Sequence, residues 1–389
     1  MDDRDVVVVG AGLMGAATAW SLARRGRSVL LLEQFAPRHD RGSSHGSARI
    51  VRRAYSDALY TRLTGEAFEL WSELEQQSGA TILRMYGGLD YGPRRDVAAV
   101  AGHLADAGAP HEVLPADEAE RRWPGIRFSG DVVFHPQGGT MDAAGAVDAF
   151  VAEAARHGAE VRFETEVLAL HPGDDRAEVE LAGSERIGAR SVVVAAGGWA
   201  EPLLAGLVTL PPIEVTQQQI FHFPRLDPGA PPWPSVIHED VESVYHLAGG
   251  RDGGPGDDRK IGGHHHGAAT TAAGRSGRVD PDSRRRVVEY VKRWLPGLDP
   301  TPRGEATCLY TTTPSEDFIL DRVGALVVCS PCSGHGAKFA PLIGELTADL
   351  ATGATGTTGA IGPTAARVPD RFRLAAHLNR TSVTRGVSL

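Results

Sequence analysis

The chain has 389 residues, 42% of them hydrophobic, which is enough for two lobes with a substantial buried core. Its 49 acidic and 40 basic residues give a formal net charge of −9, which argues against nucleic acid or an anionic membrane as a partner. Only 3 cysteines are present, an odd and sparse set that gives no disulfide framework. Without a signal-peptide pattern or a membrane-spanning apolar run, we expect a cytoplasmic protein.

The N-terminal segment predicts a βαβ unit. Residues 6–9 are four consecutive valines, a run typical of a strand buried on both faces of a parallel sheet. A glycine-rich turn follows, then a helix over residues 16–25 with Gly26 as its C-cap, and a second strand over residues 28–33.

The turn after the first strand has the spacing of a dinucleotide-binding loop. Gly10 allows the tight turn, Gly12 lets the backbone approach a pyrophosphate, and Gly15 lets the helix pack on the strand. The helix N-terminus then directs its partial positive charge at the phosphates. Glu33 ends the second strand, where a carboxylate accepts hydrogen bonds from a ribose. These parts predict dinucleotide binding but do not separate FAD from NAD(P).

The rest of the chain alternates between helical periodicity and short apolar runs. Helices are predicted over residues 60–78, 143–157, 281–295 and 339–350. Strands are predicted over residues 160–163, 166–170, 191–199 and 325–329. The proline-rich stretch 211–234 suits an antiparallel sheet, whereas 248–258 is a loop and 351–363 an irregular tail.

Buried strands recur at the start, the middle and the end of the chain, which predicts a discontinuous domain in a two-lobed α/β (α+β) fold. A Rossmann-like dinucleotide-binding domain is expected from residues 1–85, 145–210 and 305–389. A substrate domain with an antiparallel sheet is expected from residues 86–144 and 211–304.

Four separated blocks carry more specific information. They are GSSHGSARIVRRAY at residues 42–55, KIGGH at 260–264, CLYTTTP at 308–314 and SGHGAKF at 333–339. In this order they resemble the monomeric sarcosine oxidase and N-methyltryptophan oxidase family, within the D-amino-acid-oxidase-like flavoproteins. The resemblance covers nearly the whole chain and implies an FAD cofactor.

The resemblance also implies roles for single residues. Cys308 matches the cysteine that carries the flavin through an 8α thioether, a bond that a thiolate is competent to form. Arg52 and Lys338 match the pair that binds the substrate carboxylate. An arginine can donate two parallel hydrogen bonds to a carboxylate, and a lysine supplies a compact positive charge. Lys260 matches the lysine on the face where oxygen reacts, where a fixed ammonium stabilises developing negative charge.

Other positions follow from the same resemblance. His45, Arg49 and His264 fall on positions that line the active site. The family's substrate-side tyrosine aligns with His246, a departure that puts sarcosine itself in doubt as substrate. The residues expected to contact FAD are Gly10, Gly12, Leu13, Met14, Gly15, Glu33, Gln34, Ser44, His45, Arg49, Cys308, Gly334, His335, Gly336 and Lys338.

The reaction implied is the oxidation of a secondary or tertiary amino acid, N-methyl or cyclic, to an imine, with O2 reduced to H2O2. A flavin amine dehydrogenase with another acceptor and a non-catalytic flavin-binding protein are the alternatives. The family resemblance suggests a monomer. We expect no metal, because adjacent histidines at 264–266 point to opposite faces of a strand.

Overall fold

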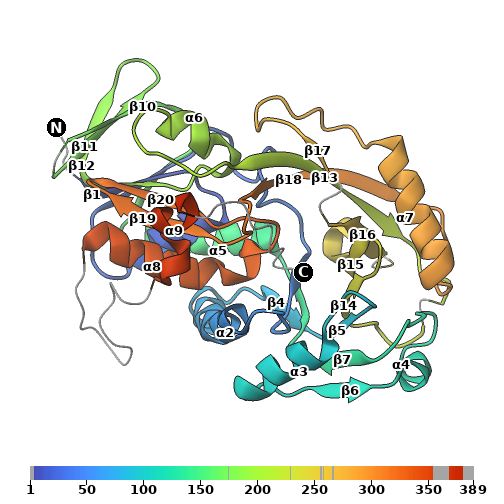
Figure 1. Ribbon diagram of the computed structural model, residues 1–389. Coiled ribbons are helices and arrows are strands. Elements are labelled where there is room, and N and C mark those ends of the chain that lie inside the picture. The colour runs from blue at the N-terminus through green and yellow to red at the C-terminus, as the bar shows by residue number, and fades with distance from the viewer. Residues whose placement is uncertain are drawn as a thin grey trace.

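The computed structural model describes residues 4–173, 175–227, 229–254, 256, 258–264, 267–353 and 368–379. Two histidines of the 264–266 run and most of the predicted tail at 351–363 therefore lie outside the described residues. Figure 1 shows two parts side by side, one with several helices around a mainly parallel sheet and one in which α7 (Pro281–Trp294) covers an antiparallel sheet. No helix within the described ranges is both long and apolar enough to cross a membrane.

Eight strands form the first sheet, with β1 (Arg4–Val9) near its centre. The others are β2 (Val29–Leu32), β9 (Glu160–Arg162), β10 (Val167–Pro172), β11 (Ala177–Leu181), β12 (Arg186–Val194), β19 (Ile319–Val323) and β20 (Leu326–Ser330). The order is β10-β11-β12-β1-β2-β9, with β20 beside β12 and β19 beside β20. β1 pairs in parallel on both sides, with Val7 opposite Leu30 and Val192. The valine run is buried, as its composition predicts.

One face of this sheet is covered by helices that pack on one another: α1 (Leu13–Ala23), α2 (Ala58–Ser78), α5 (Ala143–Arg156) and α8 (Ala340–Thr352). The short helices α6 (Ala200–Leu204) and α9 (Leu374–Leu378) pack on β10 and β19. The first helix begins three residues earlier than predicted, so Gly15 lies in its first turn. Its C-cap is Arg24 rather than Gly26, which forms the following turn with φ +74°.

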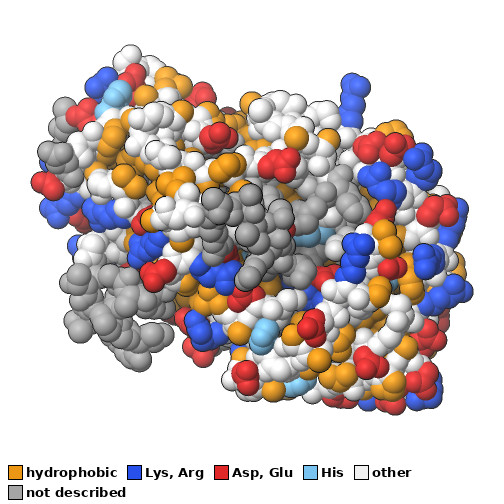
Figure 2. Space-filling model, in the orientation of Figure 1, with side chains coloured by type: hydrophobic (Ala, Val, Ile, Leu, Met, Phe, Trp, Pro, Cys, Tyr) orange, Lys and Arg blue, Asp and Glu red, His pale blue; other side chains and the backbone are white. Residues whose placement is uncertain are grey.

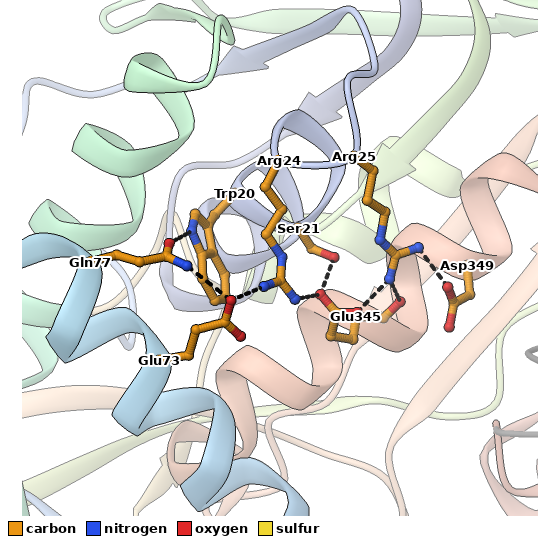
Figure 3. A network of polar contacts seen from close by, with 8 residues as sticks. All are labelled: Trp20, Ser21, Arg24, Arg25, Glu73, Gln77, Glu345 and Asp349. Atoms are coloured by element: carbon orange, nitrogen blue, oxygen red, sulfur yellow. Dashed lines mark hydrogen bonds and ion pairs between the residues drawn. The ribbon is translucent and has the colours of Figure 1, made fainter. Parts of the chain in front are cut away.

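A polar network ties α1 to its neighbours at its C-terminal end (Figure 3). Arg24 Nη1 lies 2.5 Å from a carboxylate oxygen of Glu73 on α2, and its other nitrogen contacts Glu345 on α8. Arg25 bridges Glu345 at 2.5 Å and Asp349 at 2.6 Å. Every charged group of the cluster therefore meets an opposite charge.

The second sheet has nine strands and is antiparallel except where β14 pairs with β5. Its strands are β5 (Gly88–Tyr91), β6 (Glu112–Leu114), β7 (Val132–His135), β13 (Glu214–Phe223), β14 (Ser235–Glu239), β15 (Ser243–Ala248), β16 (Arg259–Gly263), β17 (Ala268–Ala269) and β18 (Gly304–Thr312). β18 pairs with β13 along its length, so this sheet extends to Thr312 rather than ending at residue 304. The rest of the domain division stays a prediction.

Smaller elements complete the structure. β3 (Arg49–Val51), β8 (Gly139–Met141) and β4 (Leu83–Met85) form a three-stranded sheet, and α3 (Val97–Asp106) and α4 (Ala116–Arg122) flank β6 and β7. Short 3₁₀ turns are η1 (Gly197–Trp199), η2 (Gly250–Gly253), η3 (Gly336–Phe339) and η5 (Asp370–Phe372). On the face drawn in Figure 2, acidic and basic side chains are interspersed over the coloured surface.

Candidate active site

The phosphate loop has the close contacts that its glycines predict. A side chain on Gly15 would come within 1.8 Å of the Gly10 carbonyl oxygen, and one on Gly10 within 2.7 Å of the Ala195 carbonyl oxygen. Gly10 also has φ +100°, which favours glycine. Ser44 accepts a hydrogen bond from the Leu13 amide at 3.0 Å, which holds the 42–55 block against the start of α1. The loop therefore presents bare backbone where a phosphate would approach.

Glu33 is buried at the end of β2. Its two carboxylate oxygens accept hydrogen bonds from the amides of Ala11, at 2.9 Å, and Phe35, at 3.0 Å. Burial alone would raise its pKa, but His39 and these two amides outweigh burial and hold the pKa below the usual value. An ionised acceptor thus faces the place where a ribose would lie.

A cavity of about 800 Å³ extends from this loop to the antiparallel sheet. At one end it is lined by Gly10, Gly12, Leu13, Met14, Glu33, Gln34 and Ser44. At the other end it is lined by His45, Arg49, Tyr245, Lys260, Cys308, Tyr310, Gly334 and Gly336. The volume lies in the upper part of the range found for ligand and cofactor pockets. The four sequence blocks therefore meet in one cavity.

Two cations share one carbonyl at the sheet end of this cavity. Lys260 Nζ donates to the Ala48 oxygen at 2.8 Å, and Arg49 Nη1 donates to the same oxygen at 3.0 Å. Burial, with the charge of Arg49, lowers the pKa of Lys260 to about 7. Burial and the same two cations lower the pKa of His45 to about 4, so its imidazole is neutral near pH 7.

Cys308 lies on β18, opposite Gln218 of β13, with its side chain at this end of the cavity. Burial raises the pKa of its thiol, while Arg49 and Lys260 oppose that rise. The thiol forms no disulfide.

The predicted carboxylate-binding pair is buried and gathers around one tyrosine. The Arg52 guanidinium lies 4.1 Å from the centre of the Tyr55 ring, and Lys338 Nζ donates to the Tyr55 hydroxyl at 2.9 Å. Neither cation is among the described residues that line the large cavity, although Gly336 and Ala337 beside Lys338 are. Arg52 is 1% exposed, and none of its three nitrogens has a hydrogen-bond partner among the described residues. A buried guanidinium in that state is prepared to receive an acceptor.

Comparison with known proteins agrees with this geometry. The family model described as FAD dependent oxidoreductase matches residues 5–350. The chain belongs to this family. The monomeric sarcosine oxidase of Streptomyces avermitilis is 36% identical over 368 residues, which cover 91% of this chain and 94% of that protein. The N-methyl-L-tryptophan oxidase of Yersinia pestis is 30% identical, over 89% of this chain and 94% of that protein.

A solved structure supports the same assignment. NikD, described as an unusual amino acid oxidase essential for nikkomycin biosynthesis, superposes with a TM-score of 0.80 at 27% identity. The match covers 94% of this chain and 98% of that one. FAD is therefore the cofactor of this FAD dependent oxidoreductase, and the bare glycine loop and ionised Glu33 fit its pyrophosphate and ribose.

One predicted substrate contact, His246, is not among the described residues that line the large cavity. The His246 ring accepts a hydrogen bond from Arg259 Nε at 2.9 Å and packs near Trp233, on the face covered by α7. Tyr245, its neighbour, faces the cavity instead. The bare Gly262 leaves room for it, because a side chain there would lie 2.6 Å from the Tyr245 hydroxyl. The cavity wall thus carries a phenol one position before His246.

Two other predicted positions can be placed. The His264 ring lies 5.7 Å from that of Tyr310, and a side chain on Gly334 would come within 2.9 Å of His264. Neither His264 nor His335 is among the described residues lining the large cavity. The His335 ring contacts the Tyr55 hydroxyl at 3.3 Å through Nδ1 and the Glu316 carbonyl at 3.1 Å through Nε2.

A group of buried charges behind Arg52 was not predicted. Asp90 Oδ1 lies 2.6 Å from Arg95 and 3.6 Å from Arg52. Arg95 also contacts Glu239 at 2.9 Å. Burial would raise the pKa of Asp90, but Arg95, His135 and Arg52 hold it below the usual value. No motif marks these residues, since the parallel pairing of β14 with β5 brings them together.

Proposed function

We propose that this protein is an amine oxidase for secondary or tertiary amino acids, N-methyl or cyclic, with O2 as the electron acceptor. The observation that carries the proposal is the placement of two cation pairs, Arg49 with Lys260 at the end of the cavity and Arg52 with Lys338 beside Tyr55. The names of its relatives, a sarcosine oxidase and an N-methyl-L-tryptophan oxidase, support the same class of substrate.

In this proposal the side chains have separate tasks. Arg52 and Lys338 bind the substrate carboxylate, and Tyr245, His264 and Tyr310 border the substrate. Bound FAD supplies a two-electron acceptor for oxidation of the carbon–nitrogen bond. Overall, an N-methyl amino acid, O2 and water give the demethylated amino acid, formaldehyde and H2O2.

The oxygen side is served by Lys260 and Arg49. Both donate to the Ala48 carbonyl, and Lys260 is buried, so their positive charges lie together where they stabilise negative charge that develops on oxygen. The neutral His45 beside them adds no competing charge near pH 7.

We further propose that Cys308 carries FAD covalently. Forming the thioether replaces one S–H and one C–H bond by a C–S bond, and O2 accepts the two hydrogens and their electrons as H2O2. Mass spectrometry of the denatured protein should show the chain plus one FAD, and the Cys308→Ser variant should show the chain alone. A wild-type mass without FAD contradicts this linkage.

The function is tested by measuring peroxide release from a panel of N-methyl and cyclic amino acids, each beside its methyl ester. Peroxide is expected with the acids and not with the esters, because the esters offer no carboxylate to Arg52 and Lys338. Equal turnover of acids and esters contradicts the carboxylate site. Reduction of a dye without peroxide indicates a dehydrogenase instead. We also expect a cytoplasmic protein that is a monomer. Light scattering of the purified protein tests the oligomeric state.

A further inference from the structure

Tyr55 lies between the two cations assigned to the substrate carboxylate. Its side chain is completely buried. Arg52 lies over the ring at 4.1 Å from its centre, whereas Lys338 Nζ contacts the hydroxyl oxygen at 2.9 Å. One side chain therefore touches a guanidinium with its π face and an ammonium with its hydroxyl.

The direction of each hydrogen bond around Tyr55 follows from its partners. The Glu316 carbonyl can only accept, so His335 Nε2 carries the proton in the contact at 3.1 Å. In a neutral imidazole Nδ1 is then an acceptor, and the Tyr55 hydroxyl donates to it at 3.3 Å. The oxygen of Tyr55 is left to accept from Lys338, which also donates to the His335 carbonyl at 2.8 Å.

These contacts fix the two cations in different ways. Lys338 has two of its N–H groups committed, so the ammonium is oriented and one donor remains for a ligand. Arg52 is held by its flat face, and its nearest carboxylate oxygen, on Asp90, is at 3.6 Å, too far for a hydrogen bond. Its donors therefore remain available in the plane of the guanidinium.

We propose that Tyr55 is a positioning residue that holds Arg52 and Lys338 in the relative arrangement that one carboxylate group requires, with His335 fixing the orientation of its hydroxyl. This inference rests on the proposed function and adds a residue to which that function assigns no task. Tyr55 acts through the two cations and does not itself bind the substrate.

The arrangement also has a consequence for pH dependence. Burial, and then the charge of Arg52, lower the pKa of Lys338 well below its usual value. The groups that face the ammonium are the Arg52 guanidinium, the Tyr55 hydroxyl and the carbonyl and ring of His335. Because the Tyr55 oxygen accepts from the ammonium, it favours the charged form. Removing that oxygen should lower the pKa further, so carboxylate binding should be lost at a lower pH.

The test uses the FAD-loaded enzyme and its Tyr55→Phe variant, with acetate as the probe and acetamide as the uncharged comparison. Binding is measured by calorimetry and by the change in flavin absorbance, across a series of pH values. Tyr55→Phe keeps the ring beneath Arg52 and removes only the hydroxyl. Acetate affinity should fall about tenfold, as for loss of a hydrogen bond to a charged group. The alkaline limb of the pH profile of acetate binding should move to lower pH.

Tyr60→Phe is the matched control. Tyr60 is equally buried, its ring lies 5.5 Å from that of Tyr55, and its hydroxyl donates to Asp317 at 3.0 Å. It should leave acetate affinity and the pH limb unchanged. Equal affinity and an unmoved limb in Tyr55→Phe would overturn the inference, as would the same loss in both variants. Failure of the wild-type enzyme to bind acetate would instead remove the carboxylate site, and with it the proposed function.

Discussion

Two groups of charges in this protein are arranged in opposite ways. At the C-terminal end of α1, Arg24 and Arg25 meet carboxylates of Glu73 on α2 and of Glu345 and Asp349 on α8 (Figure 3). Beside Tyr55, Arg52 has no hydrogen-bond partner on any nitrogen within the described part of the chain, and Lys338 donates only to neutral oxygens. The first group is partly exposed at its edge, whereas Arg52 and Lys338 are almost completely buried.

In the proposed function this difference separates charges that serve the fold from charges that bind the substrate. A buried cation without a hydrogen-bond acceptor keeps a desolvation cost that charge attraction offsets only in part. The neighbouring Asp90 is already hydrogen-bonded by Arg95, so its ion pair with Arg52, at 3.6 Å, adds charge attraction without a hydrogen bond. A substrate carboxylate, as proposed above, would supply the hydrogen-bond acceptor that Arg52 lacks.

The largest expected effect is on catalysis by an Arg52→Met variant. Loss of one partner of a buried charge pair with the substrate should lower kcat/KM about a thousandfold. The free energy of unfolding should change by no more than about 1 kcal/mol, because Arg52 donates no hydrogen bond in the folded protein. Peroxide assays and urea unfolding measure the two quantities.

Arg53→Met is the control for that variant. Arg53 is adjacent in sequence but donates to Gln137 at 3.1 Å. It should keep nearly full activity. A severe loss of stability in Arg52→Met would contradict the distinction between the two groups of charges, because Arg52 would then stabilise the fold as Arg24 does.

Lys260→Met should have the next largest effect, on the reaction of the reduced enzyme with O2. At pH 6 the ammonium is charged, and its loss should slow peroxide formation about a hundredfold. The pKa of Lys260 is about 7, so the charge, and with it the advantage of the wild-type enzyme, should fade as pH rises through that value. Rapid mixing of reduced enzyme with oxygen across pH measures this.

Lys292→Met supplies the comparison, because Lys292 is exposed and pairs only with Glu289, at 2.8 Å, in the described structure. Its oxygen reaction should match the wild type at every pH. A constant ratio between wild type and Lys260→Met from pH 6 to pH 9 would argue against a charged Lys260 as the cause.

Glu345→Gln tests the other side of the comparison. Glu345 serves both Arg24 and Arg25, and its side chain is 12% exposed. Its neutralisation should lower the free energy of unfolding by about 2–3 kcal/mol and leave kcat/KM unchanged. Urea unfolding measures the effect. Glu73→Gln is the control, because Glu73 is more exposed and its neutralisation should lower the free energy of unfolding by about 1 kcal/mol or less. Equal unfolding of Glu345→Gln and wild type would show that the network is not structural.

Local patterns were sufficient for much of the fold. The valine run at 6–9, the spaced glycines and Glu33 identified the βαβ unit, because each depends only on near neighbours in sequence. The resemblance supplied FAD, and the same blocks supplied the site residues that meet in the cavity. Long-range pairing was not accessible in this way. Asp90 and Glu239 become neighbours of Arg95 only because β14 lies parallel to β5.

The placement of His246 away from the cavity was inaccessible for a similar reason. Successive residues of a strand face opposite sides, so an alignment that slips by one residue assigns the wrong face. The pairing of Leu247 with Lys260, and of Tyr245 with Gly262, identifies the cavity side. Counting back from Lys260 through the hairpin would have selected Tyr245, but the length of the turn between β15 and β16 is not fixed by sequence alone.

The smallest expected effect separates these two neighbours. Tyr245→Phe removes a hydroxyl that borders the substrate end of the cavity, so KM should change by up to about tenfold while stability is kept. His246→Gln, on the face covered by α7, should lower the free energy of unfolding by about 1 kcal/mol through its contact with Arg259 and leave KM unchanged. Steady-state kinetics and urea unfolding of both variants give the comparison. If His246→Gln alone altered KM, the side chain at 246 would act on the substrate, and the facing assigned to β15 would have to be reversed.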